Sequence, residues 1–283
     1  MKLSQPASDI HIPDGSPVAA ALARTTHLCI AAHQDDIEIM AHSAIAECHG
    51  RADLGFTGVV VTDGGGSPRA GKFAAMTDDE MKLVRRDEQR RAADLGRYAA
   101  QIQLAHPSSV VKDPQAAVVV GDLSVLLAAM SPRVVYLHNP ADKHDTHIAV
   151  LLRCLAALRA LPEGRRPARI LGCEVWRNLD WLLDADKAVL DDSARPELAA
   201  ELIGAFQSQI AGGKRYDLAI AGRRLANATF FTSHATDRAN ALTWAMDLTP
   251  LVRDPRLDVE QFTLGYIDRL RADVAARLRK FSR

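Results

Sequence analysis

The sequence predicts an α/β protein with a Rossmann-like, mainly parallel sheet that is flanked by helices. Short apolar segments with strand character alternate with longer segments of helical periodicity. Strands that alternate with helices of this length form βαβ units, whose strands run parallel. A chain of 283 residues is long enough to bury one large core of this kind without disulfides or metal staples.

Five segments have the character of buried strands. They are residues 27–33, 55–62, 101–105, 133–138 and 169–176. The segments between them favour helices because their apolar residues recur at helical spacing. These helices are expected at residues 37–49, 78–95, 116–130 and 146–161. Helix 78–95 is the clearest, with Gly96 as the expected C-cap.

The two ends of the chain are less regular. The first ~15 residues are polar and contain prolines, which favours a loose arm. After residue 176 we expect a helix near 197–210, an apolar patch over 226–231 and a basic amphipathic helix over 259–281. No internal repeat or low-complexity linker divides the chain. We therefore predict a single domain over 1–283, with a catalytic core at about 24–176 and a C-terminal extension at about 177–283.

Composition excludes several classes of protein. Lys plus Arg and Asp plus Glu both number 35, so the net charge is zero, and this balance argues against nucleic acid and an anionic membrane as partners. The four cysteines contain no C-x-x-C pair, which argues against a zinc ribbon and a disulfide scaffold. The N-terminal segment lacks the apolar stretch of a signal peptide, and no apolar run is long enough to span a membrane. We expect a cytoplasmic enzyme.

Two clusters of histidine and aspartate follow the first and fourth predicted strands. AHQDDIE occupies 32–38, and HNPADKHDTH occupies 138–147. In the common strand order 3-2-1-4-5, strands one and four are neighbours at the topological switch point, where ligands bind. His33 and Asp36 are three residues apart and converge where a strand turns into a helix. His144 and His147 are also three apart and share a helix face.

This arrangement predicts a metal site. Two histidines and one carboxylate with an open coordination position are typical of catalytic zinc. The same donors can hold non-haem iron, but the alternating α and β segments disfavour the all-β fold usual for those oxygenases. The first βα turn contains no glycine, which argues against a nicotinamide or flavin site. The glycine-rich loop 63–71 lacks the spacing of a phosphate-binding loop and is expected to flank the pocket instead.

Four motifs, in this order, carry a resemblance to a known family. They are A-H-x-D-D-x-E after the first strand, T-D-G-G-G after the second, R-x-x-E-x-x-x-A-x-x-L-G from Arg85 to Gly96, and P-x-D-x-H-x-x-H from Pro140 to His147. Over residues 27 to 176 the chain resembles the PIG-L/LmbE family. The members of this family are zinc-dependent N-deacetylases that act mainly on N-acetylglucosamine-type amides.

The resemblance implies a role for each matching residue. His33, Asp36 and His147 would be the zinc ligands, and Asp35 the general base. His144 would stabilise the oxyanion, and Arg85 would contact the sugar. There are two departures. Gln34 replaces the usual proline, and the second motif runs His144-Asp145-Thr146-His147 in place of H-P-D-H. The carboxylate that orients the histidine must then come from Asp142 or Asp145.

The predicted function is therefore metal-dependent hydrolysis of the N-acyl, chiefly N-acetyl, amide of an amino sugar or an N-acetylglucosamine conjugate. About one zinc ion per chain, or another divalent metal, would serve as cofactor. The partner is a small-molecule substrate, and the basic helix 259–281 is either a solvated face or a homo-oligomer contact. The alternative is a non-catalytic, sugar-binding relative with the same fold. Glu88 either forms a structural ion pair with Arg85 or holds it over the sugar.

Overall fold

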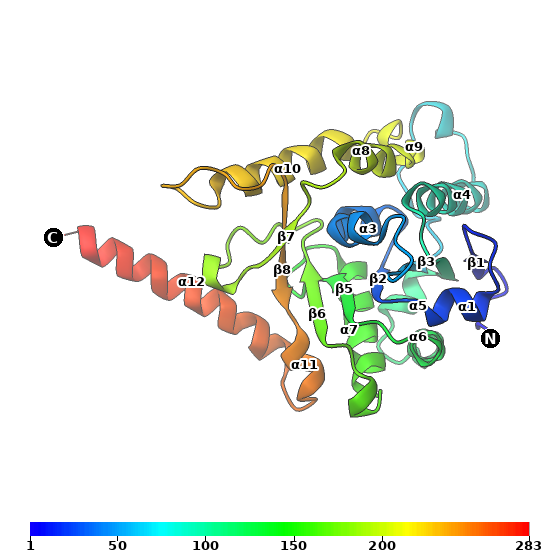
Figure 1. The fold of residues 1–283 in the computed structure, drawn as a ribbon, viewed down its shortest axis with the longest axis horizontal. Coiled ribbons are helices and arrows are strands. Elements are labelled where there is room, and N and C mark those ends of the chain that lie inside the picture. Colours follow the sequence, from blue (N-terminus) through cyan, green and yellow to red (C-terminus); the bar gives the residue numbers. More distant parts are fainter. Residues whose placement is uncertain (283) are drawn as a thin grey trace.

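The first histidine cluster, 32–38, directly follows β2 (His27–Ala31), a strand in the middle of the sheet (Figure 1). The computed structural model describes residues 1–282. Its strands are β1 (Asp9–His11), β2 (His27–Ala31), β3 (Phe56–Thr62), β4 (Ala100–His106), β5 (Val134–His138), β6 (Arg169–Cys173), β7 (Ala188–Asp191) and β8 (Leu242–Asp247). The order across the sheet is β1-β4-β3-β2-β5-β6-β8-β7. The five parallel strands in the middle have the predicted 3-2-1-4-5 order, which confirms the fold class.

Three edge strands were not predicted. β1 pairs antiparallel with β4 through Asp9↔Gln103, so the N-terminal arm is not loose over its whole length. At the other edge β8 pairs antiparallel with both β6 and β7. β7 lies in the aspartate-rich segment 180–192 of the extension, and with four residues it is too short to show the alternation that marks a strand. The extension thus completes the sheet of the core.

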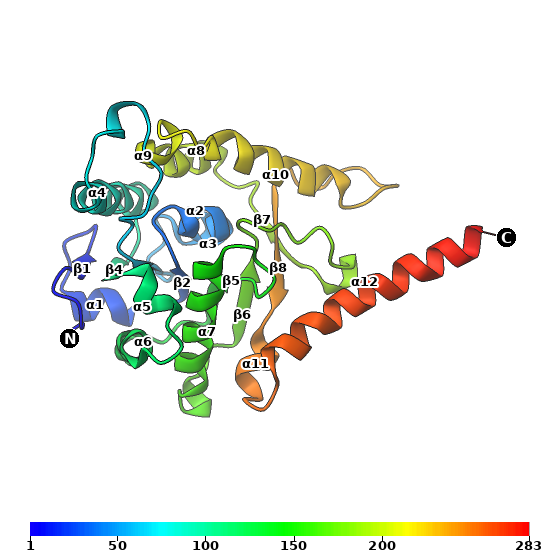
Figure 2. The ribbon, with the colours of Figure 1, turned by 180° about the vertical axis from the view of Figure 1, so that it is seen from behind.

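The helices cover both faces of the sheet (Figures 1 and 2). They are α1 (Val18–Ala23), α2 (Asp36–Met40), α3 (His42–Cys48), α4 (Asp78–Gly96), α5 (Ser108–Lys112), α6 (Ala117–Ala129), α7 (Asp145–Arg159), α8 (Pro196–Gly204), α9 (Gln207–Ile210), α10 (Tyr216–Phe230), α11 (Thr249–Arg253) and α12 (Val259–Phe281). The single helix expected over 37–49 is two helices, because it breaks at Ala41. The apolar patch 226–231 lies mostly within α10.

Two apolar cores, one on each face, hold these layers together. One core packs residues of α6, α7 and α11 against the sheet, including Leu123, Leu151 and Leu251. The other packs α2, α3 and α8, including Ile37, Ile45 and Leu202. Burial of such side chains contributes roughly 1.5–3 kcal/mol each. The carboxyl ends of the parallel strands are therefore fixed by a rigid scaffold.

Helix α4 begins and ends with recognisable caps. Thr77 and Glu80 form a capping box at its start. The helix ends at Gly96, and Arg97, with a φ of 51°, takes the left-handed position that we expected Gly96 to take. The buried side of α4 runs through Met81, Arg85 and Gln89. Two polar residues therefore face the sheet in the middle of this helix.

The remaining features of the fold concern the cysteines and the long helices. The cysteines Cys29, Cys48, Cys154 and Cys173 are all buried and unbridged. No helix in residues 1–282 combines the length and the apolar character that crossing a membrane requires. Helix α12 runs outward from α11, and its C-terminal end lies away from the sheet (Figures 1 and 2).

Candidate metal centre and active site

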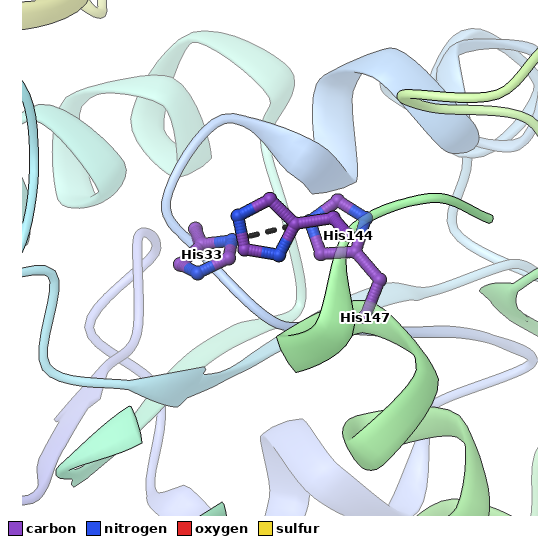
Figure 3. A group of neighbouring side chains, drawn as sticks. All are labelled: His33, His144 and His147. Atoms are coloured by element: carbon purple, nitrogen blue, oxygen red, sulfur yellow. Dashed lines mark hydrogen bonds between the residues drawn. The ribbon is translucent and has the colours of Figure 1, made fainter. Parts of the chain in front are cut away.

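The two histidine clusters meet where β2 and β5 end. These strands are parallel neighbours, with Cys29 opposite Tyr136, so the segments that follow them leave the sheet side by side. The first segment places His33 before α2 and Asp36 at the start of this helix. The second places His144 before α7 and His147 in its first turn. Figure 3 shows the imidazole rings of the two segments facing one another.

Three side-chain atoms form a nearly equilateral triangle. His33 Nδ1 lies 3.2 Å from Asp36 Oδ2 and 3.2 Å from His147 Nε2. His147 Nε2 lies 3.3 Å from Asp36 Oδ2. We call His33, Asp36 and His147 the donor cluster. The backbone N–H of His33 donates to Asp36 Oδ2 over 2.8 Å, which ties the two ends of the turn together.

The charges of the donor cluster depend on one another. Burial raises the pKa of the Asp36 carboxyl, but the neighbouring His147, His33 and His138 outweigh burial and hold it well below its usual range. Burial lowers the pKa of His147, but the carboxylates of Asp36 and Asp142 raise it to about 9. A protonated His147 beside an ionised Asp36 is therefore the favoured charge state at neutral pH.

His138, the first residue of the 138–147 cluster, lies against this centre although the sequence analysis gave it no role. It is the last residue of β5 and is fully buried. Its ring stacks on that of His147, with centroids 3.9 Å apart, and its Nε2 accepts a hydrogen bond of 2.9 Å from the Ala32 N–H. Asp36, His138 and His147 form one group of potential metal donors, and His33, His144 and His147 form another. Because Nε2 of His138 already accepts this hydrogen bond, it is not free to bind a metal. We therefore assign His138 the role of positioning His147 through ring stacking.

Asp142 is the carboxylate that orients a histidine of the centre. Its Oδ2 lies 3.1 Å from His147 Nδ1, and its Oδ1 accepts the backbone N–H groups of Lys143 and His144. Such a carboxylate fixes which ring nitrogen of the histidine is free to bind a metal. Asp145 is exposed at the start of α7. Of the two carboxylates left open by the sequence, Asp142 is the one in contact, and its partner is His147.

His144 forms one wall of the centre. Its ring stacks on His147 with centroids 4.5 Å apart, and it meets the edge of His33 at 5.0 Å (Figure 3). Burial and the nearby His147 and His33 lower the pKa of His144 to about 4. A neutral ring is therefore favoured at neutral pH, and it can still donate one N–H. The buried Nδ1 has no hydrogen-bond partner within residues 1–282.

The Asp35 carboxylate contacts Arg85, whereas that of the adjoining Asp36 contacts the histidines of the donor cluster. The backbone φ of Asp35 is 100°, a left-handed value that is rare for residues other than glycine and costs on the order of 1–3 kcal/mol. This turn sends two neighbouring carboxylates in different directions. Burial raises the pKa of Asp35, the cation of Arg85 opposes it, and the resulting pKa is about 7.

Arg85 lies behind Asp35. Its side chain is buried, with Nη2 3.3 Å from Asp35 Oδ2, and it also donates to the Gln34 carbonyl. Its Nε and Nη1 have no hydrogen-bond partner among the described residues. The predicted sugar contact of Arg85 stays a prediction. The contacts in this structure join Arg85 to the residue predicted to be the base.

Glu88 and Arg85 form the ion pair that one of our alternatives expected, but a long one, with Arg85 Nη1 4.0 Å from Glu88 Oε2. Glu88 also accepts two hydrogen bonds of 2.6 Å, from the backbone N–H and the hydroxyl of Ser208. It therefore fastens α9 to α4. These two hydrogen bonds hold the C-terminal extension next to the candidate site.

Gln34 and Gly64 pack against Arg85. Gln34, which stands where the family usually has proline, donates from Nε2 to Gln103 Oε1 over 3.1 Å. Gly64 has a φ of 74°, and a Cβ there would lie 2.6 Å from the Gln34 side chain and 3.1 Å from Arg85 Cβ. Only glycine fits this turn without displacing one of them. The loop after β3 therefore supports Arg85 and flanks the site, as the sequence predicted.

A small cavity opens beside the two aspartates. Its volume is about 140 Å³. Its walls are Asp35, Asp36, Ile39, Val175, Trp176, Tyr216, Ala219, Ile220 and Arg223. The extension supplies the far wall through α10, and Trp176 lies between Tyr216 and His144, with ring centroids 6.3 and 6.0 Å away. The wall opposite the aspartates thus comes largely from the half of the chain where the sequence pattern was weakest.

Comparison with known proteins agrees with this geometry. Residues 28–158 match the model of the PIG-L family, described as GlcNAc-PI de-N-acetylase. The matched segment runs from β2 into α7 and contains both histidine clusters. This match confirms the resemblance that the motifs indicated: residues 28–158 of the chain are similar to the PIG-L family. No curated protein matches the sequence.

Solved structures share the fold over most of the chain. One is N,N'-diacetylchitobiose deacetylase from Pyrococcus horikoshii, at a TM-score of 0.64 and 15% identity, covering 86% of this chain and 90% of that one. A conserved protein from Thermus thermophilus has a TM-score of 0.59 at 17% identity, covering 83% and 99%. GalB, the 4-carboxy-2-hydroxymuconate hydratase from Pseudomonas putida, has a TM-score of 0.56 at 18% identity, covering 83% and 98%. A deacetylase and a hydratase thus share one fold, so that the reaction must be inferred from the site.

Proposed function

We propose that this protein is a metal-dependent N-deacetylase that hydrolyses the acyl amide of an amino sugar or an N-acetylglucosamine-containing conjugate. The observation that carries the proposal is the donor cluster, with three atoms of metal-ligand type 3.2 to 3.3 Å apart and the buried carboxylate of Asp35 next to it in sequence. The family whose model matches residues 28–158, described as GlcNAc-PI de-N-acetylase, supports the same reaction class.

The donor cluster suits a zinc ion. In tetrahedral sites with bonds of about 2.0–2.2 Å, neighbouring donor atoms are roughly 3.3–3.6 Å apart, close to the separations here. Two imidazoles and a carboxylate leave one coordination position open, as catalytic zinc requires. Asp142 holds His147 so that Nε2 is the free nitrogen. A bound zinc would supply Lewis-acid chemistry, lowering the pKa of water and polarising the amide carbonyl.

The chain's own residues would then perform the proton transfers. Asp35 is buried, adjoins the donor cluster and has a pKa of about 7, a value suited to a general base at neutral pH. In our proposal Asp35 accepts the proton of the attacking water and returns a proton to the leaving amine. His144 donates an N–H to the developing oxyanion from the other side. A single donor of this kind lowers the activation free energy by roughly 3 kcal/mol.

The size of the cavity supports a short acyl group. Pockets that enclose a whole small molecule have volumes of roughly 300–1,000 Å³, and this cavity has about 140 Å³. The acyl amide would enter the cavity, and the sugar would lie outside it. The apolar walls Ile39, Val175 and Ile220 suit the methyl end of an acetyl group.

The test combines metal analysis with an assay of amine release. The purified chain is loaded with zinc, and release of free amine and acetate is measured on N-acetylglucosamine and its glycosides. Metal binding with amine release supports the proposal, and metal binding with sugar binding but no release indicates the non-catalytic alternative. Hydration of an unsaturated carboxylate, the reaction named for GalB, is assayed in parallel. If only hydration is found, the deacetylase proposal is wrong.

A further inference from the structure

Helix α12 carries a stripe of exposed apolar side chains along one side, which runs from Leu264 and Ile267 in its inner half to Phe281 at its outer end. Leu264, Ile267, Val274, Leu278 and Phe281 are exposed by 46, 42, 46, 64 and 76%. Their spacing places all five on one side of the helix. We call them the outer stripe. Large exposed apolar side chains that gather on one face mark an interaction surface more often than scattered ones do.

The C-terminal half of α12 extends beyond the body of the protein (Figures 1 and 2). Arg269 still reaches the body, with its Nε 2.8 Å from Asp186. The ion pairs farther along, Arg271–Asp268 and Arg277–Asp273, join residues of α12 itself. Helices in proteins owe most of their stability to the packing of an amphipathic face, so this half of α12 is expected to pack against a partner.

A groove lies beside the other half of the same helix. It has a volume of about 630 Å³ between α7 and α12. Ile148 and Leu152 of α7, Leu264 and Ile267 of α12, and Trp181 line it. The groove is therefore continuous with the outer stripe, and it is apolar enough to receive side chains such as Leu278 and Phe281. One molecule thus carries both a protruding apolar helix end and a groove of matching character.

We propose that the occupant is a second copy of this chain, with the two α12 helices packed antiparallel about a two-fold axis. The outer stripe has the symmetry that this requires. A crossing near Leu270 places Leu264 opposite Leu278 of the other copy and Ile267 opposite its Val274. In a two-fold interface each contact occurs twice, so the end of each helix fills the groove of the other copy.

The charges on α12 fit the antiparallel arrangement. Glu260, at its start, is exposed beside the groove, whereas Arg277, Arg279 and Lys280 lie near its end. An antiparallel pair brings the acidic start of one helix to the basic end of the other, and a parallel pair opposes like charges. Complementary charges of this kind set the orientation of paired helices.

The first experiment measures oligomeric state by sedimentation velocity over a range of protein concentrations. The unaltered chain should sediment as a dimer. The variant Leu278→Glu/Phe281→Glu should dissociate about 10⁴-fold more readily, because the two apolar side chains are each buried twice and each burial contributes roughly tenfold to binding. Phe230→Glu is the matched control, since Phe230 is 80% exposed on α10. If Phe230→Glu dissociates the dimer and the α12 variant does not, the interface lies elsewhere and the proposal is wrong.

The second experiment tests the orientation with a charge exchange. Arg277 lies beside the outer stripe, whereas Lys280 lies on the opposite side of the helix. Glu260→Lys and Arg277→Glu should each weaken the dimer, and the double variant should restore it. The two residues are 17 positions apart on one helix, about 26 Å, so rescue cannot arise within a chain. A chain that stays monomeric at all concentrations overturns the proposal. Binding of that monomer to vesicles of anionic lipid would instead assign the basic amphipathic helix to a membrane surface.

Discussion

The two neighbouring aspartates of the candidate active site, Asp35 and Asp36, have opposite pKa shifts because their surroundings differ. On one side, Asp36 lies among imidazoles that keep it ionised, and the donor atoms converge on a point suited to a cation. On the other, Asp35 faces a single guanidinium, and burial raises its pKa to about 7. The left-handed turn at Asp35 separates the two carboxylates. Adjacent residues of the same type can therefore serve as a ligand and as a base because their surroundings differ.

The largest effect is expected from the donor cluster. His147→Ala removes the imidazole that contacts both other donors, so the variant should lose most of its bound zinc and all measurable activity. Elemental analysis after dialysis measures the zinc. His106→Ala is the matched control: His106 is also fully buried at the end of a strand, but it pairs with Asp122 at 2.9 Å, outside the centre. Full zinc occupancy in His147→Ala would remove this residue from the ligand set.

The next effect separates the two aspartates. Asp35→Asn keeps the shape of the side chain but cannot accept a proton, so activity should fall by about 10²-fold or more while zinc is retained. Asp36→Asn should lose zinc, because a neutral amide is a weaker ligand than a carboxylate. Zinc content and deacetylation rate are measured on both variants. The opposite pattern, with zinc lost from Asp35→Asn and kept in Asp36→Asn, would reverse the assigned roles.

A smaller effect is expected from the support of the donor cluster. Asp142→Asn leaves every proposed ligand in place but weakens the hold on His147 Nδ1, so zinc affinity should fall by about 10- to 100-fold. Competition with a chelator measures this affinity. Asp145→Asn, on the exposed start of α7, serves as control and should bind zinc normally. Equal affinity in both variants would show that Asp142 does not position the ligand.

The central sheet and the meeting of the two histidine clusters were predictable from sequence. Apolar segments reveal parallel strands that are buried on both faces, and the strand order then places the ends of β2 and β5 together. Strands β1, β7 and β8 were missed because they are short edge elements, and their pairing depends on partners far along the chain. No local pattern encodes such partners.

Within the site, the sequence indicated which residues gather but not how they bond. His138 belonged to the second cluster but received no role, because a histidine that ends an apolar strand resembles any packed core residue. The contact of Arg85 with Asp35 was missed because it depends on the positive φ at Asp35 and on the close approach of Gly64 to Gln34, neither of which has a periodic signature. The roles given to His33, Asp36, His147, Asp35 and His144 stay predictions that the variants above can test.

The smallest expected effect decides what Arg85 does. Its cation lowers the pKa of Asp35, which burial alone would raise further. Since a base acts only when deprotonated, removal of this cation should shift the acid limb of the pH–rate profile to higher pH by about one unit or more. Arg85→Met retains much of the buried volume and should show this shift, and Arg85→Lys retains the charge and should show less.

The same variants test the sugar contact that the family resemblance implies for Arg85. A residue that binds the sugar alone would raise KM in Arg85→Met and leave the acid limb where it was. A residue that holds and tunes Asp35 would move the acid limb of kcat and change KM little. Thermal unfolding of both variants is the necessary control, because Arg85 is buried in the middle of α4 and a variant that unfolds reports on neither role. If KM rises and the limb is unmoved in a folded variant, the contact between Arg85 and Asp35 is structural and the sugar contact is the functional one.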